Sequence, residues 1–320
     1  MASLLDVANC GGTTGTFNSG YPICDVIRDI PYMLALADSG FEFSEAEMAS
    51  ATTFAAAWAA GTTAPRGNRL YPIKSLTNFE DLSKEATKIS LGNLTNAEIE
   101  GVEAVPAFGF QHRKGELYHR QLAKAESENL KVYIVDKKYV VYGTRTSGKA
   151  LAPFSVTEFK AGLPKFGTPA AASYYPFAIT LSELTEYKEN GGFFQATSAI
   201  VGSSGLVDVV LSEFAFATNV LKVGLTALGG KNLTDLYSTE LQQATAWIVK
   251  NKTTGLAVTV SSAFDSTNKV MALTLSGTPF TGAASGDEFT CDLNIPSVLA
   301  ATPISISGYE STGPITVEKP

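Results

Sequence analysis

Hydrophobic and polar residues alternate along the second half of the chain. Met271, Leu273 and Leu275 occupy every second position of one segment, and residues 256–260 and 289–293 repeat the pattern. A period of two is typical of strands with one face in the core and the other in water. Turn-forming Gly, Asn, Asp and Ser residues separate these segments. The strands predicted here are 206–211, 220–226, 246–249, 256–261, 270–276, 289–293 and 315–317.

One stretch of this half has a helical period instead. Leu233, Leu236, Tyr237 and Leu241 recur on one side of residues 232–244 and predict a single helix. Many short strands with regular turns and one helix are the pattern of an antiparallel β-sandwich. We therefore expect a β-sandwich in this part of the chain.

The first half mixes the two periods. Ser44 and Glu47 match a capping box before an alanine-rich run, which predicts a helix that continues to Ala60 and is ended by Gly61. The apolar positions of residues 114–126 predict a second helix. Further β-branched and aromatic runs predict strands at 69–73, 88–91, 105–110 and 174–181, and a hairpin formed by 130–135 and 139–144.

Pro31 interrupts the apolar segment 24–36. Proline lacks the N–H group that an interior strand donates to its neighbour, so this segment predicts an edge strand or two short pieces.

Glycine-rich positions divide the chain. At 320 residues it is longer than a single core usually supports, and the cluster of Gly and Ser at 202–205 marks the expected boundary. We predict a glycine-rich extended arm at 1–24, a first domain at 25–204 and a second domain at 205–320. The predicted fold class is mainly β with a few helices (α+β), with an N-terminal β-sandwich or barrel flanked by helices.

Composition favours a protein that works through its surface. Charged residues make up 17% of the chain, against about 25% in an average soluble domain. A net charge of −7 disfavours nucleic-acid binding, which depends on clustered Lys and Arg. The three cysteines, Cys10, Cys24 and Cys291, predict free thiols in a reducing compartment. Neither a signal peptide nor an apolar run long enough to span a membrane is predicted.

The two histidines are the first candidates for chemistry. His112 and His119 lie seven residues apart, and Glu116 is the one further metal ligand at a suitable spacing. A solvated helix with basic neighbours explains the same residues, and we prefer that interpretation. The basic neighbours are Arg113, Lys114, Arg120 and Lys124.

Other candidate motifs are incomplete. The segment 202–205 misses the G-x-S-x-G pattern around Ser203, and residues 11–15 lack the Lys-Ser/Thr ending of a phosphate-binding loop. Three clusters of glutamates contain enough carboxylates for the pair that glycoside hydrolysis needs. We interpret these glutamates instead as residues of solvated faces. The sequence therefore predicts no catalytic, cofactor-binding or metal-binding residue. The clusters are Glu42, Glu45 and Glu47; Glu98, Glu100 and Glu103; and Glu183, Glu186 and Glu189.

The order of elements from Val105 to Gly143, a strand, a helix and a hairpin, followed by the strand Tyr174–Leu181, resembles structural proteins of tailed bacteriophages. It is most similar to the tail-tube family. The resemblance implies a tube-like assembly domain at 25–204 and an immunoglobulin-like β-sandwich domain at 205–320. It also implies a non-enzymatic subunit that forms homo-oligomeric stacked rings in the virion, after synthesis in the bacterial cytoplasm.

The same resemblance implies the partners. They are copies of the chain itself, other virion proteins, and DNA that passes through a lumen without specific binding, with no membrane involved. The arm 1–24 and the loop Ala161–Pro169 are the expected contacts between subunits. Neck, head-decoration and capsid roles remain open as alternatives. So do a carbohydrate-binding or adhesin-like module, which would need exposed Trp58 or Trp247, and an enzyme with a carboxylate pair.

Overall fold

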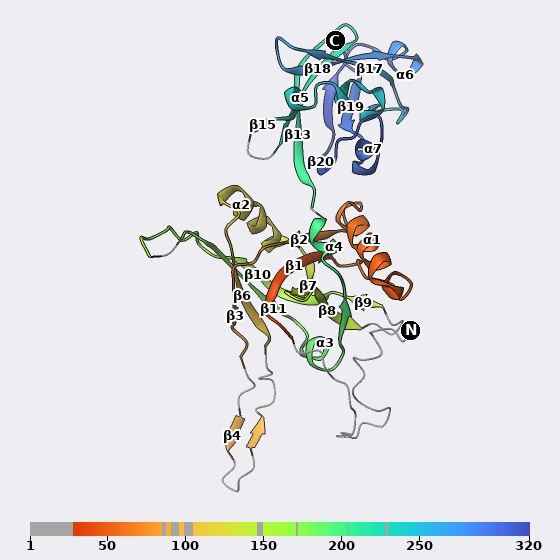
Figure 1. Cartoon of the computed structure of the whole chain (residues 1–320). Helices are drawn as coiled ribbons and strands as arrows, with labels where there is room; N and C mark the ends of the chain where they lie inside the picture. Colours follow the sequence, from red (N-terminus) through yellow and green to blue (C-terminus); the bar gives the residue numbers. More distant parts are fainter. Residues whose placement is uncertain are drawn as a thin grey trace. The chain divides into compact units, whose positions relative to one another are not determined.

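The structure is a computed structural model of the chain. It describes residues 28–84, 88–90, 96–98, 105–145, 150–170, 172–203, 205–227 and 230–320, so the arm expected at 1–24 lies outside the described residues. The chain divides into two compact units, which we call the N-terminal unit, ending at Gly205, and the C-terminal unit, beginning at Leu206 (Figure 1).

The strand β7 (Leu130–Asp136) lies inside the ten-stranded sheet of the N-terminal unit. β1 (Pro31–Asp38) runs antiparallel along one of its edges. The other edge is shared, because the end of β7 forms a hairpin with β8 (Val140–Arg145) and its beginning pairs with β10 (Phe154–Ala161). The sheet therefore branches at β7 into an arm β8-β12 and an arm β10-β11-β6-β3.

The other elements of this unit are short. The strands are β2 (Leu70–Ile73), β3 (Asn78–Asp81), β4 (Lys88–Ser90), β5 (Asn96–Glu98), β6 (Ala107–His112), β9 (Leu151–Ala152), β11 (Tyr175–Leu181) and β12 (Gly191–Gln195). The helices are α1 (Ala51–Thr62), α2 (Glu116–Lys124), α3 (Leu184–Lys188) and α4 (Ala199–Gly202), with single 3₁₀ turns at η2 (Glu47–Ala49) and η3 (Ala125–Ser127).

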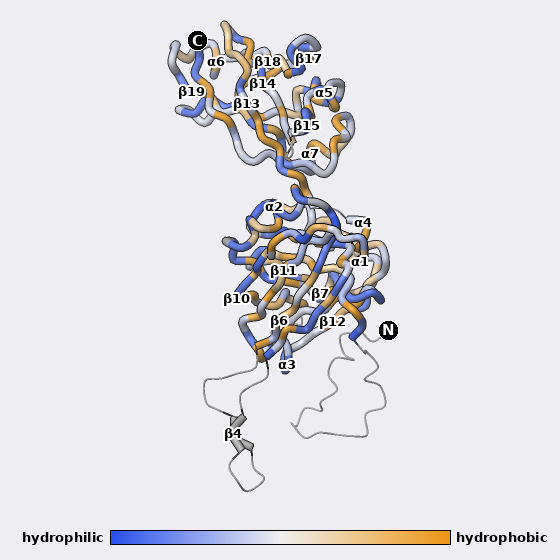
Figure 2. Tube along the Cα trace, turned by 90° about the vertical axis from the view of Figure 1, so that its left-hand side faces the viewer, coloured by the Kyte–Doolittle hydropathy of each residue, from blue (hydrophilic) through white to orange (hydrophobic). Residues whose placement is uncertain are grey.

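Two hydrophobic cores lie on opposite faces of β1 and β7. The run Met33–Ala37 is apolar at every position because β1 is buried on both faces. Its odd-numbered residues pack in one cluster with Trp58 of α1. Leu34 and Leu36 pack in the other cluster, which includes Leu122 of α2. Figure 2 shows hydrophobic stretches, in orange, running through the strands of this unit.

The prediction of an edge strand around Pro31 was wrong. β1 has β2 on one side and β7 on the other, so it is an interior strand. Pro31 is its first residue, and the pairing register with β7 shifts between Pro31 and Met33. The missing N–H thus falls at the end of the ladder, a position at which strands accept proline.

The first helix begins later than the sequence predicts. Ser44 and Glu47 form their capping contacts, but these close only the turn η2. Ser50 is extended and caps α1 through a second box with Thr53, so the helix starts at Ala51. The second predicted helix and the hairpin at 130–144 are confirmed by α2, β7 and β8.

The C-terminal unit is a sandwich of two sheets. Its strands follow the order of an immunoglobulin fold, in which one sheet holds strands A, B, E and D and the other holds C, F and G. Here one sheet runs β17-β18-β14-β13, extended by β20, and the other runs β16-β19-β21. The strands are β13 (Val207–Ala217), β14 (Val220–Ala227), β16 (Trp247–Asn251), β17 (Thr259–Asp265), β18 (Val270–Ser276), β19 (Glu288–Leu293), β20 (Tyr309–Ser311) and β21 (Ile315–Glu318).

The core of this unit occupies the space between its two sheets. Trp247, at the third strand of the immunoglobulin order, is buried, and its indole Nε1 donates to the carbonyl of Leu241 at 2.8 Å. Cys291 lies in the same core on the neighbouring strand β19. Antibody domains carry a Trp on strand C, which corresponds to β16, and one cysteine of the disulfide between strands B and F on the strand that corresponds to β19. Here the cysteine of β19, Cys291, is a free thiol.

Two predictions in this unit need correction. Residues 232–244 do not form one helix, because α5 (Leu233–Leu236) ends at Tyr237 and two 3₁₀ turns, η4 (Glu240–Gln242) and η5 (Ala244–Ala246), follow. The strand expected at 256–261 begins only at Thr259, which leaves Leu256 outside the strand and 57% exposed. The remaining short elements are β15 (Lys231–Asn232), α6 (Thr278–Thr281) and α7 (Pro296–Ala300).

The predicted fold class is confirmed. The described chain is mainly β, its helices are short, and the strand order of the second unit is that of an immunoglobulin-like sandwich.

Candidate interaction surface

His112 and His119 do not lie on a solvated helix face, so that interpretation was wrong. His112 ends β6 with no exposed surface, and His119 lies on the buried side of α2 with 5% exposed. Their rings meet, with 3.2 Å between His112 Nε2 and His119 Nδ1. Spacing along the sequence could not reveal this contact, because one residue belongs to a strand and the other to a helix.

The hydrogen bonds of the pair fix which nitrogens carry protons. His119 Nε2 lies 2.8 Å from the carbonyl oxygen of Gly162, which can only accept, so this nitrogen donates. His119 Nδ1 then accepts from His112 Nε2, and His112 Nδ1 accepts from the backbone N–H of Lys114 at 3.3 Å. Both rings are neutral in this chain of bonds. No ring nitrogen keeps a free lone pair with which to hold a metal ion.

The surroundings of His112 oppose positive charge. Burial, the neighbouring His119 and Lys114 lower the pKa of His112 to about 4. Burial and the nearby Lys74 lower the pKa of Lys114 to about 8. The phenol of Tyr118, close to the Lys114 ammonium, has its pKa raised to about 12 by burial. An enclosed and fully hydrogen-bonded pair of this kind is a structural clamp.

What the pair clamps is the start of an exposed loop, residues 162–170, which we call the apolar loop. His119 holds its first carbonyl, at Gly162. Glu126, just after α2, accepts from the backbone N–H of Ala161 at 2.6 Å. One donor, His119, and one acceptor, Glu126, thus fix the base of the loop against the rest of the unit. The apolar loop leaves the sheet at the end of β10 (Figure 1).

The apolar loop exposes large hydrophobic side chains. Phe166 is 96% exposed and Leu163 is 80% exposed, the two highest values among the large hydrophobic side chains that the structure describes. Lys165 pairs with Tyr174 in a two-bond bridge, so the hairpin of β10 and β11 continues outward to this point. Phe166 follows the bridge directly. The sequence places an expected subunit contact at Ala161–Pro169, and the loop is exposed and available for such a contact.

A hollow of about 220 Å³ lies on the neighbouring sheet surface, and we call it the sheet hollow. It lies on the face of the sheet that carries the half-exposed residues of β6 and β11, while the alternating aromatic side chains of these strands are buried on the opposite face. Small residues make room for it, because a Cβ atom at Gly109 would lie 3.2 Å from Leu82. The lining residues are Asn78, Glu80, Leu82, Gly109, Phe110, Gln111, Lys160, Gly162, Pro176, Phe177 and Ala178.

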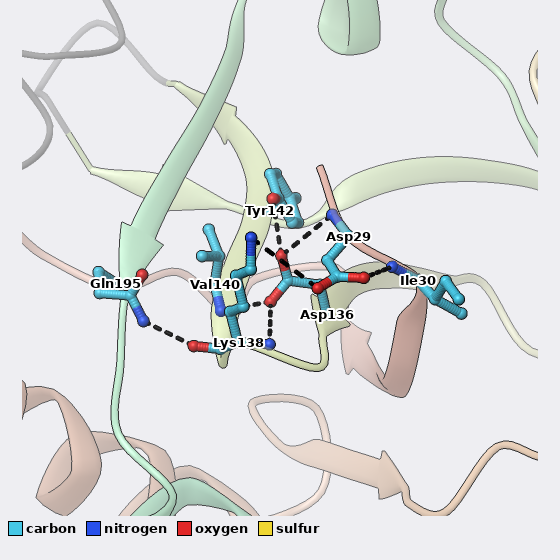
Figure 3. A network of polar contacts seen from close by, with 7 residues as sticks. All are labelled: Asp29, Ile30, Asp136, Lys138, Val140, Tyr142 and Gln195. Carbon is cyan, nitrogen blue, oxygen red and sulfur yellow. Dashed lines mark hydrogen bonds and ion pairs between the residues drawn. The ribbon is translucent and has the colours of Figure 1, made fainter. Parts of the chain in front are cut away.

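Asp136 is a buried carboxylate that the sequence analysis did not single out. Its Oδ1 accepts from the N–H groups of Lys138 and Val140 at 2.8 and 2.9 Å, and its Oδ2 accepts from the hydroxyl of Tyr142 at 3.0 Å (Figure 3). These bonds close the β7-β8 turn. Burial and the Asp136 carboxylate raise the pKa of Tyr142. Both oxygens of this carboxylate therefore accept hydrogen bonds that stabilise the fold.

Two of the clustered glutamates, Glu47 and Glu186, form hydrogen bonds that hold the fold. Glu47 caps a turn, and Glu186 accepts from the backbone and side chain of Ser155. The side chains of Glu98, Glu100 and Glu103 lie outside the described residues. No group of three potential metal ligands is present in the part of the chain that the structure describes.

The remaining candidates are also structural. Trp58 is completely buried and Trp247 is 4% exposed, so neither can stack on a sugar. Cys291 is buried, and burial together with the nearby Asp292 raises the pKa of its thiol to about 12. Ser203 is the residue that follows the short helix α4. Residues 11–15, Cys10 and Cys24 lie outside the described residues.

Neither models of known protein families, nor curated proteins, nor solved structures give a match to this chain. Among the described helices, none combines the length and the apolar character needed to cross a membrane. Among the described residues, the apolar loop carries the two most exposed large hydrophobic side chains, and the sheet hollow lies beside it.

Proposed function

We propose that this chain is a non-enzymatic structural subunit that assembles with copies of itself, in the manner of the tail-tube subunits of tailed bacteriophages. The observation that carries the proposal is the nearly complete exposure of Phe166 on a loop with a fixed base. An exposed aromatic side chain is costly in water and is typical of a surface that a partner covers. The two histidines and the buried Asp136 use their side chains to hold the fold.

Charge and architecture support the same proposal. A net charge of −7 suits a channel through which DNA passes without binding, because acidic walls repel phosphate. An immunoglobulin-like unit with its own core can be carried by each subunit without taking part in the central assembly. In this proposal the N-terminal units of identical chains assemble with one another, and other virion proteins bind to the assembled rings.

Purification of the full chain tests the proposal. We expect light scattering after gel filtration to give a mass of several subunits, and electron microscopy to reveal rings or stacked tubes. The measurements should cover a wide range of protein and salt concentrations, since a closed ring needs enough subunits to form. A monodisperse monomer under every condition would contradict the proposal.

The shape of the product separates the roles within a virion. Stacked rings with a central channel support a tail tube. Single rings of fixed size support a neck component, and closed shells support a capsid or decoration role. Each of the last two outcomes keeps self-assembly and overturns the tail-tube assignment.

A further inference from the structure

We propose that the Phe166 side chain of one copy inserts into the sheet hollow of a second copy. This inference rests on the proposed function, since it names the contact through which the subunits assemble. The knob is the apolar loop, residues 162–170, and the socket is the surface formed by β3, β6, β10 and β11.

The knob is held ready for insertion. Its base is fixed by the His119 and Glu126 contacts, and the bridge between Lys165 and Tyr174 stiffens the hairpin up to the residue before Phe166. A loop whose backbone is already ordered at its base loses less conformational freedom when a partner buries it. Aromatic anchors of this kind dominate the energetics of many interfaces.

The socket has the size and chemistry to receive an aromatic ring. Its floor is made of small residues, Gly109 and Ala178, together with Pro176. Leu82 stands beside it with 42% of its surface exposed, so the socket has an apolar wall that water now covers. Insertion of a ring would remove apolar surface of both partners from water at once.

We take the partner to be another copy, because one chain carries both surfaces and Lys165 beside the knob is opposite in charge to Glu80 of the socket. Gly162 lies at the edge of the sheet hollow, and Phe166 follows four residues later on a hairpin that extends away from that edge. A contact between two different surfaces of identical subunits is head-to-tail, and such contacts generate rings or filaments.

Charge provides the orientation. Lys165 adjoins the knob and is exposed, while Glu80 is exposed on the rim of the socket. Lys160 is also exposed in the lining of the socket, so docking should be favoured in the direction that places Lys165 near Glu80 and away from Lys160. An exposed ion pair contributes little free energy, so its main effect is to favour one direction of docking.

The direct test places a photoreactive benzoylphenylalanine at position 166 of the full chain. Unlabelled chains that carry it are mixed with ¹⁵N-labelled wild type and irradiated, and mass spectrometry locates the cross-links. We expect links between the two kinds of chain that fall on peptides containing residues 107–111 or 176–178. Links within one chain, or links between chains at any other surface, would overturn the inference.

Two sets of variants test the energetics. Phe166→Ala should raise the protein concentration needed for assembly about tenfold or more. Leu117→Ala is the matched control, because Leu117 is also an exposed apolar residue, at 55%, but belongs to neither the apolar loop nor the lining of the socket. Lys165→Glu and Glu80→Lys should each weaken assembly, and the double variant should restore it.

These outcomes separate the inference from the proposed function. If wild type forms rings and Phe166→Ala forms them equally well, self-assembly stands and the knob contact is refuted. If wild type never assembles, both fail. Binding of wild type to phosphatidylcholine vesicles that is lost in Phe166→Ala, with no cross-link between copies, would assign the knob to a membrane surface and overturn the inference.

Discussion

Individual polar residues inside the N-terminal unit are paired mainly with backbone groups. Asp136 accepts N–H groups of its own turn, and His119 donates to a carbonyl 43 residues away. Residue type alone does not disclose such partners, because any residue supplies the same backbone groups. This is why the sequence analysis treated the two histidines as solvated and passed over Asp136, although the hairpin that Asp136 closes was predicted.

Replacement of Asp136 separates its charge from its shape. Asp136→Ala leaves two buried N–H groups and the Tyr142 hydroxyl without an acceptor, so we expect a loss of about 3 kcal/mol in the free energy of unfolding. Asp136→Asn keeps an oxygen for the two N–H groups and offers its amide to the hydroxyl, so about 1 kcal/mol is expected. Urea unfolding measures both. Equal losses would mean that the negative charge itself is required.

His112 makes stability depend on pH. Its pKa is about 4 in the folded chain and near 6.5 when unfolded, so between these values only the unfolded chain takes up the proton. The contribution to stability is complete above pH 6.5 and is lost as the pH falls to about 4. Charged or titratable neighbours are Lys74, Lys114, Tyr118, His119 and Tyr175.

Urea unfolding of wild type and His112→Gln between pH 7.5 and 4 checks this dependence. The difference in unfolding free energy between the two proteins should shrink as the pH falls, because the variant has no imidazole to protonate. Parallel curves over the whole range would contradict the assignment.

Gly143 of β8 allows an unusually close approach of two strands. A Cβ atom there would lie 2.3 Å from the carbonyl oxygen of Ala152 and 3.0 Å from the ring of Tyr133. We expect Gly143→Ala to lower the free energy of unfolding by about 2 kcal/mol. Gly202→Ala is the control, since a Cβ atom at this exposed end of α4 meets nothing within 4 Å. Thermal melts of both variants decide the point, and equal melting temperatures would refute it.

At the scale of elements, strong periodic patterns predicted most strands and both longer helices, whereas boundaries and neighbours depended on tertiary contacts. The strand predicted at 270–276 matches β18 at both ends. The helix expected at 232–244 broke into turns because the core uses Leu233, Leu241 and Ala246 from three separate short pieces. The pairing of β1 with a strand far along the chain left no local signal, so its interior position could not be predicted.

The start of α1 offers a test at this scale. Ser50 caps a helix of 12 residues, whereas the Ser44 hydroxyl only accepts a long hydrogen bond from the Glu47 N–H, at 3.4 Å. Ser50→Ala should therefore lower the unfolding free energy by about 1 kcal/mol. Ser44→Ala should cost clearly less. Circular dichroism during urea unfolding compares the two, and the reverse order would place the true start of the helix at Ser44.

The molecule as a whole consists of two units with separate cores. One core cluster lies entirely beyond residue 206, and the other two lie entirely before it. Along the sequence, mixed helix and strand patterns give way to short strand patterns, and two domains were predicted from this change. The sheet hollow could not be predicted, because it is formed by residues from four strands that only the branched sheet brings together.

Each unit carries one of the two buried tryptophans, Trp58 or Trp247, which makes the independence of the units measurable. In Trp58→Phe, fluorescence reports on the C-terminal unit alone. We expect its urea midpoint to equal that of a fragment of residues 206–320, since the core of that unit is complete within the fragment. A fragment that unfolds without cooperativity would refute separate folding.

The interior position of β1 also affects the chain while it is being synthesised. About ninety residues separate its apolar run from β7, the strand that covers one of its edges. At about 5–20 residues per second, a ribosome needs roughly 5–20 s to synthesise that distance. During this interval the nascent chain holds out a segment that is apolar at five successive positions. Chaperones that bind short hydrophobic segments should therefore bind this chain early, before β7 has been synthesised to cover the second edge of β1.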